Sequence, residues 1–346
     1  MNLGCVHSKR ASGLDKACGE AKLISLIHLW SLPFSMNDDF ENSNPVLAYD
    51  PPPAGYDASM LRKAPPPRML DHQRIARAVR LIERTPATST TLKDVSAHFG
   101  LSPFHFQRQF QEVMGESPSA YMRRTRLDRA AMNLQMSAQP ITHIAFNAGY
   151  ASHEAFIRAF QRQFGATPSD YRVAAQKVLP ARPPPRKADL ARVKVGRRPE
   201  MRLLAMRFYG SYALVEENWR KFGEYLKRVG FPMGQARPVG IILDTPLITP
   251  GELVRYDCAV VDQGFPVEDT ALSPLQLRAG RYVSTNHAGL YAEIFRAYEF
   301  VSIDWITTSG EIFLPDGNGG YEFYNLPPWD HTGRMQNLDI VLPLAG

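Results

Sequence analysis

Two stretches of this sequence decide the fold of its middle part, 92-LKDVSAHFGLSPFHFQRQFQEVMGESPSAY-121 and 141-ITHIAFNAGYASHEAFIRAFQRQFGATPSDY-171. From Phe106 onward the first stretch recurs in the second with a constant offset of 50 residues, so that Phe106 matches Phe156. Before that point the offset is 49, which makes the second turn one residue longer. Internal self-similarity of this kind indicates a duplicated structural unit.

Each copy predicts a helix-turn-helix. Gly100 and Gly149 fall where a short first helix must end and reverse, at a position that favours positive φ. Ser102 and Ser152 follow as natural N-caps of a second helix. A helical hairpin used only for packing is the alternative interpretation, and two copies in one basic segment make it the weaker one.

The second helix of each copy has an apolar and a polar face. Phe106 and Phe110 share one side at helical spacing, as do Phe156 and Phe160. Arg and Gln on the opposite side are the groups that pair with guanine and adenine edges, although any one of them could belong to a solvated helix face. Arg108 and Arg158 are favoured because they occupy equivalent positions. The candidate DNA-binding residues are Phe104, Gln107, Arg108, Gln111, His153, Glu154, Arg158 and Gln161.

Charge and composition divide the 346 residues into four segments. Residues 1–67 are proline-rich without periodicity and are expected to be a disordered extension. Residues 68–177 carry a net charge of +7, and residues 178–199 read as a stiff basic linker of net charge +6. Residues 200–346 carry −6. A basic segment next to an acidic one suggests one module for a polyanion and another for a different partner.

Several classes of protein are excluded by composition. The chain is 44% hydrophobic and 21% charged, which excludes a wholly disordered chain, a collagen and a long coiled coil. Cys5, Cys18 and Cys258 form neither a disulfide framework nor a zinc pattern, so a reducing compartment is expected. The apolar stretch 23–34 is too short to span a bilayer, and no membrane association is expected.

Residues 70–176 resemble the DNA-binding domain of the AraC/XylS family, with the stretch from Gly149 to Arg172 carrying its most diagnostic signature. The resemblance implies an all-α fold in which a long helix, here Pro118–Met136, joins two helix-turn-helix subdomains. It implies double-stranded DNA and RNA polymerase as partners and a cytoplasmic location. In that family the positions matching Phe104, Gln107, Arg108, His153, Glu154 and Arg158 face the major groove. Glu154 replaces an amide of some members, and a carboxylate there could accept from cytosine N4.

Residues 200–346 predict an α+β domain. Strands are expected at 201–209, 239–243, 254–261, 281–286, 321–326 and 338–342, with helices at 215–229 and 293–308. The order β-α-β-β therefore occurs twice. A weak repeat supports this duplication, because Tyr212 and Tyr291 lie 79 residues apart, as do Trp219 and Tyr298.

This half resembles the GyrI-like effector-binding domain through 287-HAGLY-291, 320-GYEFYN-325 and 339-DIVLPL-344. The resemblance implies a cleft between the two halves, where an acidic residue matching Glu322 meets cationic ligands among aromatic rings. The chemistry is reasonable in itself, since a cation compensates a buried carboxylate. The alternative is that Glu322 lies on the solvent face of an edge strand. The candidate ligand-binding residues are Glu322, Tyr324, Tyr212, Tyr256, Tyr291 and Trp305.

Together these features predict a sequence-specific DNA-binding transcription regulator controlled by a small-molecule effector. No nucleophile elbow, HExxH motif or P-loop is present, so neither an enzymatic activity nor a cofactor or metal is expected. Two alternatives remain: an inhibitor or sequestering protein that binds a protein through its C-terminal domain, and a hydrolase of a reactive small molecule that uses Glu322 beside a tyrosine.

Overall fold

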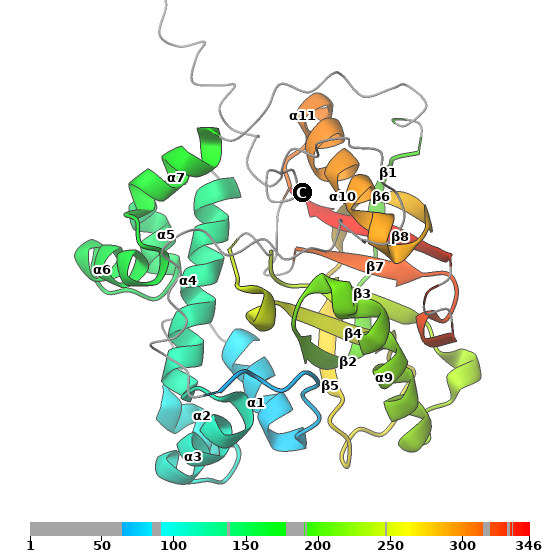
Figure 1. Cartoon of the computed structure of the whole chain (residues 1–346), viewed down its shortest axis with the longest axis horizontal. Helices are drawn as coiled ribbons and strands as arrows, with labels where there is room; N and C mark the ends of the chain where they lie inside the picture. Colours follow the sequence, from blue (N-terminus) through cyan, green and yellow to red (C-terminus); the bar gives the residue numbers. More distant parts are fainter. Residues whose placement is uncertain are drawn as a thin grey trace, which may run out of the picture.

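The computed structural model of the chain describes residues 64–84, 91–136, 139–177, 190, 192–245, 248–313, 319–330, 333 and 335–346. The extension expected at residues 1–67 lies outside the described residues as far as residue 63. The expected linker lies outside them at residues 178–189 and 191. Elements α1 to α7 form a helical domain, and strands β1 to β8 with their helices form a sheet domain beside it (Figure 1).

The helical domain contains the two expected helix-turn-helix units joined by one long helix. Its elements are, in chain order, α1 (Gln73–Arg84), α2 (Leu92–His98), α3 (Pro103–Met114), α4 (Pro118–Met136), α5 (Ile141–Asn147), α6 (His153–Phe164) and α7 (Pro168–Lys177). The second helices of the two units, α3 and α6, begin 50 residues apart, as the sequence repeat requires.

The turns and caps form as the sequence predicts. The Ser102 and Ser152 hydroxyls each accept the backbone N–H three residues further on, at 3.2 Å. Gly100 has φ 65° and Gly149 has φ 82°, a region that only glycine enters without steric cost. These local contacts fix where α3 and α6 begin, so they fix which side chains face outward.

Helix α4 belongs to the cores of both units. Near its start Tyr121 packs against Phe110 with ring centroids 5.7 Å apart, and further along Leu127 and Leu134 pack with Phe156 and its neighbours. At about 1.5 Å per residue, a helix of 19 residues is about 28 Å long. Because its two ends are buried in different cores, α4 holds the two units at a set separation.

A buried polar cluster also ties the two units together. The Arg124 guanidinium on α4 lies 2.7 Å from Glu116 and 3.6 Å from Asp128. The Gln163 amide on α6 donates to Asp128 at 2.7 Å. Arg124 is buried, so it contributes to the net positive charge of this segment without being available to a partner.

The sheet domain is built on an eight-stranded antiparallel sheet with the order β1-β6-β8-β7-β3-β4-β2-β5. The two predicted β-α-β-β units are present, and they meet at the central pair β7 and β3. The strands are β1 (Lys194–Arg198), β2 (Met201–Tyr209), β3 (Pro238–Ile242), β4 (Arg255–Val261), β5 (Ser273–Leu277), β6 (Gly280–Gly289), β7 (Gly320–Tyr324) and β8 (Gln336–Leu344).

The two edge strands were not predicted, and one of them corrects the end of the linker. The basic residues 194–198, assigned to the linker from sequence, form β1 and pair with β6. Strand β5 contains Pro274 and pairs only with β2. Edge strands commonly carry charged residues and proline, which protect against further pairing and which also hide the strand pattern in a sequence.

The two faces of the sheet are covered by different parts of the chain. Helices α9 (Val215–Arg228), α10 (Ile294–Glu299) and α11 (Ile306–Ser309) cover one face (Figure 1). The single helix expected over 293–308 is instead interrupted by a π-helical segment, Phe300–Trp305. The helical domain packs against the other face, where Tyr209 of β2 joins the core of the first helix-turn-helix unit.

A buried ion cluster joins the two domains. The Glu83 carboxylate of α1 accepts two hydrogen bonds from Arg207 of β2, both at 2.9 Å, and one from Arg255 of β4 at 2.6 Å. Arg80, one turn earlier on α1, donates to Asp257 of β4 at 2.6 Å. Burial by itself would raise the pKa of the Glu83 carboxyl, but Arg207 and Arg255 outweigh it and hold that pKa well below its usual range.

The backbone reinforces this joint. Residues 68–70, which precede α1, run antiparallel to the end of β2. The Leu70 N–H donates to the Arg207 carbonyl at 2.9 Å, and the Tyr209 N–H donates to the Arg68 carbonyl at 3.0 Å. The Arg68 side chain in turn donates to Asn218 of α9 at 3.0 Å. The helical domain is therefore attached to the sheet by both backbone and buried charge.

We expect Glu83→Gln to destabilise the folded chain by about 3–5 kcal/mol, because it leaves two buried arginines without their shared anion. Urea unfolding at pH 7 measures this loss. The extra free energy of unfolding of the parent over the variant should be fully present above the ordinary glutamate pKa. It should disappear as the pH falls through the lower pKa that Glu83 has in the folded protein. Glu217→Gln, which removes an exposed pair with Lys221, is the control and should cost less than about 1 kcal/mol. Equal losses would contradict a stabilising role of the cluster.

Candidate functional site

The outer face of α3 carries the first group of candidate DNA-binding residues. Phe104 is 77% exposed, which is unusual for a phenylalanine and leaves its ring available to a partner. Gln107 and Arg108 are also exposed, and Gln111 is half-buried. The Arg108 side chain lies 3.4 Å from Glu112 in a solvent-exposed pair. Such a pair contributes little, so Arg108 can exchange it for another acceptor at small cost.

The outer face of α6 carries the second group. Glu154, Arg158 and Gln161 are exposed at positions equivalent to those on α3. His153 is half-buried, and its Nε2 atom is buried with no hydrogen-bond partner among the described residues. The imidazole therefore points at least partly into the protein, which favours a structural role for His153 over a contact with DNA.

Glu154 has a second role that the sequence did not reveal. Hydrogen bonds from its own backbone N–H and from the Ser152 hydroxyl lower the pKa of this exposed carboxyl. The side chain therefore caps the start of α6 as an ionised group, where the helix dipole favours negative charge. It can still accept a hydrogen bond from a base, but any such contact competes with the cap.

The second candidate site is centred on Glu322. This residue lies on β7 opposite Gly240 of β3, where the two halves of the sheet meet. Its side chain is fully buried on the face covered by the helices. The alternative of a solvent-facing acid on an edge strand is therefore wrong, because β7 has a neighbouring strand on each side.

Four tyrosine hydroxyls surround the Glu322 carboxylate. They come from a strand on each half of the sheet and from the segment that follows β6. The donor–acceptor distances are 2.6 Å from Tyr256, 2.9 Å from Tyr324, 3.0 Å from Tyr291 and 3.1 Å from Tyr298. A carboxylate offers about four lone-pair positions, so these phenols satisfy it.

A second layer orients these phenols. The Trp219 indole N–H on α9 points at the hydroxyls of Tyr324 and Tyr256, at 3.1 and 3.2 Å. Gly240 provides the space for this arrangement. A Cβ there would lie 2.0 Å from the Tyr256 hydroxyl and 2.9 Å from Glu322, so a larger residue would displace the cluster.

The electrostatics of this site differ from those of the domain joint. Within the described part of the chain, no lysine, arginine or histidine pairs with Glu322. Burial raises the pKa of its carboxyl, and the tyrosine hydrogen bonds only partly offset that effect. Burial and the nearby carboxylate likewise raise the pKa of the Tyr256 phenol. The site is therefore rich in hydrogen bonds but lacks a positive charge.

The sequence predicted part of this constellation. Tyr256, Tyr291 and Tyr324 contact Glu322, whereas Tyr212 donates to the Asp244 carbonyl at 2.7 Å and packs against Tyr256. Trp305 is half-buried against the same core, in the π-helical segment, and makes no hydrogen bond to Glu322 in the described structure.

Tyr298 and Trp219 were not among the candidate ligand-binding residues. The offset of 79 residues was a signal that could have found them. It pairs Tyr212 with Tyr291 and Trp219 with Tyr298, and all four lie around the junction of the two halves.

Three further observations concern the residues that the structure describes. The described residues contain no group of three or more His, Cys, Asp or Glu side chains placed to hold a metal ion. Among the described helices, none combines the length and the apolar character needed to cross a membrane.

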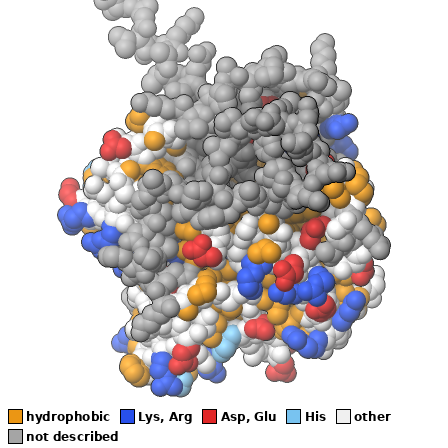
Figure 2. Space-filling model, in the orientation of Figure 1, with side chains coloured by type: hydrophobic (Ala, Val, Ile, Leu, Met, Phe, Trp, Pro, Cys, Tyr) orange, Lys and Arg blue, Asp and Glu red, His pale blue; other side chains and the backbone are white. Residues whose placement is uncertain are grey.

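On the face seen in Figure 2, basic and acidic side chains are interspersed over the region of α9, where Arg220 pairs with Glu224.

Two known domain families match the chain. A helix-turn-helix domain matches residues 95–174, and a GyrI-like small molecule binding domain matches residues 193–345. The first match lies within the helical domain and begins after α1, and the second spans the sheet domain.

Curated relatives are similar to part of the chain. The transcriptional regulator Rob of Salmonella typhimurium is 39% identical over 95 residues, 27% of this chain and 33% of Rob. The regulatory protein SoxS of Escherichia coli is 42% identical over 78 residues, 22% of this chain and 73% of SoxS. The chain spans about a third of the length of the first curated relatives that it matches.

Among solved structures, a hydrolase from Listeria innocua is 12% identical and has a TM-score of 0.30. The match covers 44% of this chain and 92% of the hydrolase. No functional conclusion follows from a likeness of this size.

We expect Glu322→Gln to change how stability depends on pH. Because the pKa of Glu322 is raised in the folded protein, the parent's stability relative to the variant is greatest below the ordinary glutamate pKa. It should then fall as the pH rises towards the shifted pKa, by up to about 1.4 kcal/mol per pH unit. Thermal and urea unfolding from pH 4 to 9 measure the difference, with exposed Glu224→Gln as the control. If the difference in unfolding free energy between the parent and Glu322→Gln is constant across this pH range, the pKa of Glu322 is not raised.

Proposed function

The chain belongs to the AraC/XylS family of transcription regulators, and we propose that it is a sequence-specific DNA-binding regulator whose GyrI-like domain senses a small molecule. The observation that carries this proposal is the pair of equivalent helices, α3 and α6, with their polar faces exposed. Helix-turn-helix proteins place such a helix in the major groove. We also propose that it works in the cytoplasm with RNA polymerase, and that it has no catalytic role.

The rigid link between the two units supports a two-groove mode of binding. Successive major-groove segments on one side of B-DNA lie about 34 Å apart, and α4 is about 28 Å long before the widths of the two units are added. Since each end of α4 is buried in a different core, one chain can present α3 and α6 to adjacent turns. A monomer would then cover an asymmetric site.

Arg108 and Arg158 are the side chains that we expect to read bases. On an operator selected from a random DNA pool, Arg108→Ala and Arg158→Ala should each weaken binding by about 1–3 kcal/mol, and by less on random DNA. Fluorescence anisotropy on both DNAs measures the losses. Arg220→Ala, which changes an exposed residue of α9, serves as the control and should change the affinity for neither DNA. Equal losses on selected and random DNA would reduce both residues to phosphate contacts.

The same titrations test the electrostatic part of the proposal. Each neutralised phosphate adds about 0.9 to the slope of log affinity against log salt concentration, and the basic segment should contact several phosphates. An operator affinity that does not change with salt would overturn the proposed DNA binding.

The Glu322 site supports a cationic effector. A buried carboxylate without a paired cation is costly, and an organic cation among tyrosine rings and Trp219 supplies the missing charge through cation–π and charge contacts. Because Glu322 exposes none of its surface, the ligand must displace phenol hydroxyls as it enters. Binding therefore moves tyrosine side chains that belong to both halves of the sheet domain, which offers a route from the effector to the arrangement of the domains.

Glu322→Gln keeps the side-chain shape and removes the charge. We expect the variant to bind a cationic dye about tenfold or more weakly, which corresponds to about 1.5–3 kcal/mol of binding free energy. Its affinity for a neutral isostere of the dye should change little. Calorimetric titration of the parent and the variant against matched pairs of dyes measures this difference. If the variant binds cations as well as the parent does, Glu322 is not the ligand anchor. A sensor should also return its ligand unchanged, whereas a hydrolase would consume it.

A further inference from the structure

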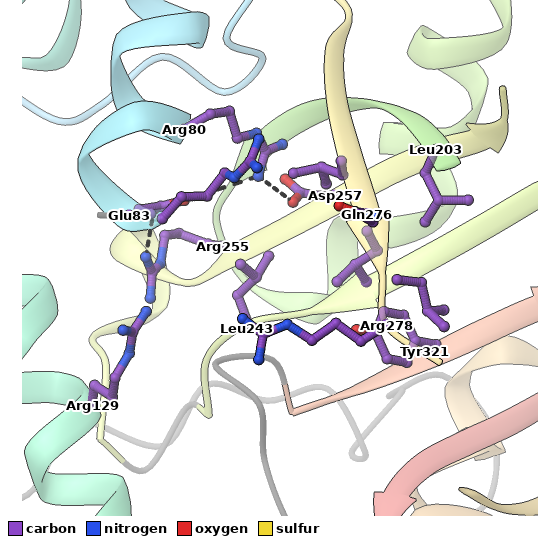
Figure 3. Close-up of a pocket in the computed structure, with 14 residues that line it drawn as sticks. Arg80, Glu83, Arg129, Leu203, Leu243, Arg255, Asp257, Gln276, Arg278 and Tyr321 are labelled. Carbon is purple, nitrogen blue, oxygen red and sulfur yellow. Dashed lines mark hydrogen bonds and ion pairs between the residues drawn. The ribbon is translucent and has the colours of Figure 1, made fainter. Parts of the chain in front are cut away.

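Strand β4 takes part in both of the buried clusters described above. Successive side chains of a strand point to opposite faces of the sheet. Tyr256 points to the face that the helices cover, where it donates to Glu322 at 2.6 Å. Its neighbours Arg255 and Asp257 point to the other face, where they belong to the ion cluster that joins the two domains (Figure 3). Adjacent residues of one strand therefore contact the Glu322 site and the domain joint.

Contacts between side chains provide a second link between the two clusters. The Tyr256 ring meets the Tyr212 ring edge-on, with centroids 6.1 Å apart. The Tyr212 hydroxyl donates to the Asp244 carbonyl at 2.7 Å, and the Asp244 carboxylate accepts two hydrogen bonds from the Arg255 guanidinium, at 2.7 and 2.6 Å. Arg255 donates in turn to Glu83 of α1 at 2.6 Å. Because close-packed interiors transmit strain, a shift of Tyr256 is passed towards Arg255.

Helix α9 provides a third link, which reaches the segment before α1. The Trp219 indole N–H points at the Tyr256 hydroxyl at 3.2 Å. The preceding residue, Asn218, is buried and accepts a hydrogen bond from the Arg68 side chain at 3.0 Å. The Arg68 carbonyl accepts the Tyr209 N–H of β2 at 3.0 Å. Three sets of contacts therefore lead from the Tyr256 phenol to the joint between the domains.

A cation bound at Glu322 changes these contacts. Glu322 exposes none of its surface, and the Tyr256 hydroxyl is the closest of the four phenols that donate to its carboxylate. A cation that takes the place of this hydroxyl shifts the Tyr256 ring and, through the ring, the strand and side chains around it. Buried ion pairs are strong only in good geometry, so a displaced Arg255 or Asp257 weakens the joint.

We propose that the effector acts through β4: a cation that displaces the Tyr256 hydroxyl from Glu322 weakens the ion cluster around Glu83 and loosens the docking of the helical domain on the sheet. This inference rests on the proposed function, since it takes the Glu322 site to be the effector site. Coupling between two sites is reciprocal, so a weakened joint also favours the binding of the cation. The effector therefore selects the loosened arrangement of the domains over the described one.

The backbone hydrogen bonds across the joint provide a readout that needs no ligand. The Leu70 N–H donates to the Arg207 carbonyl, and the Tyr209 N–H donates to the Arg68 carbonyl. These two amides exchange with solvent hydrogen when the joint opens, whereas the amides between β6 and β8 report opening of the sheet away from the joint. Hydrogen exchange followed by NMR on the full chain therefore separates a loosened joint from a loosened sheet.

Tyr256→Phe tests the coupling in the absence of any cation. It keeps the ring and removes the hydroxyl that ties β4 to Glu322. We expect it to speed the exchange of the Leu70 and Tyr209 amides by about fivefold or more, relative to the amides between β6 and β8. The matched control Tyr298→Phe removes a hydrogen bond to the same carboxylate from α10, and it should leave the two joint amides at their parent rates. Equal rates in the two variants would overturn the proposal.

A pair of glycine variants repeats the test with a wedge in place of a deletion. A Cβ at Gly240 of β3 would overlap the Tyr256 hydroxyl, so Gly240→Ala pushes this phenol out of its position. A Cβ at Gly320 of β7 would instead lie 2.6 Å from Leu342 of β8, so Gly320→Ala places its wedge elsewhere on the same face of the sheet. Faster exchange at the joint in Gly240→Ala alone supports the coupling, whereas the same change in both variants, or in neither, contradicts it.

Crystal violet, an organic cation, tests the reciprocal effect. Because Glu83→Gln weakens the joint, it should bind the dye about fivefold or more tightly than the parent does. The exposed control Glu224→Gln should bind the dye as the parent does. Equal dye affinity in Glu83→Gln and the parent would exclude the coupling. Failure of crystal violet to bind the parent would instead count against the proposed effector, and the ligand-free variants would still decide whether β4 couples the two clusters.

Discussion

The ion cluster around Glu83 is the interaction on which the arrangement of this molecule depends. Glu83 and Arg80 belong to the first helix of the helical domain, and Arg207, Arg255 and Asp257 belong to the sheet. Buried charges are stable only when their partners are in place, so the cluster forms only if both domains are folded and correctly docked. A cavity beside the cluster is lined by side chains of both domains (Figure 3).

Glu83 and Glu322 are two glutamates with little or no exposed surface, and their surroundings give them opposite properties. Glu83 is neutralised by guanidinium groups, which lower the pKa of its carboxyl, and it stabilises the domain joint. Glu322 is satisfied by phenol hydroxyls alone, which leaves the pKa of its carboxyl raised. Permanent cations accompany Glu83, which makes it structural, whereas no cationic side chain of the described residues accompanies Glu322, and this difference is what motivates our proposal of a cationic effector.

The corrections share a physical origin. Strands β1 and β5 escaped prediction because edge strands carry the basic residues and proline that also mark linkers. His153 occupies a position on α6 that helical periodicity places at the border of the exposed face, and only packing decided that its Nε2 atom is buried. Tyr298 was not among the candidates because its contact with Glu322 joins a helix to a strand 24 positions away, and only the packing of the two elements brings them together.

The sequence alone determined the elements whose causes are local. Glycine turns, serine caps and the phenylalanine periodicity specify the two helix-turn-helix units and their outer faces, because these contacts join residues at most a few positions apart. Only the tertiary structure decided what the buried acids do. Glu322 meets Tyr256 and Glu83 meets Arg207 across 66 and 124 positions of the chain, and the pairing of distant strands and domains sets those distances. A sequence pattern can show that a carboxylate will be buried, but the charge of its partner depends on which surfaces dock.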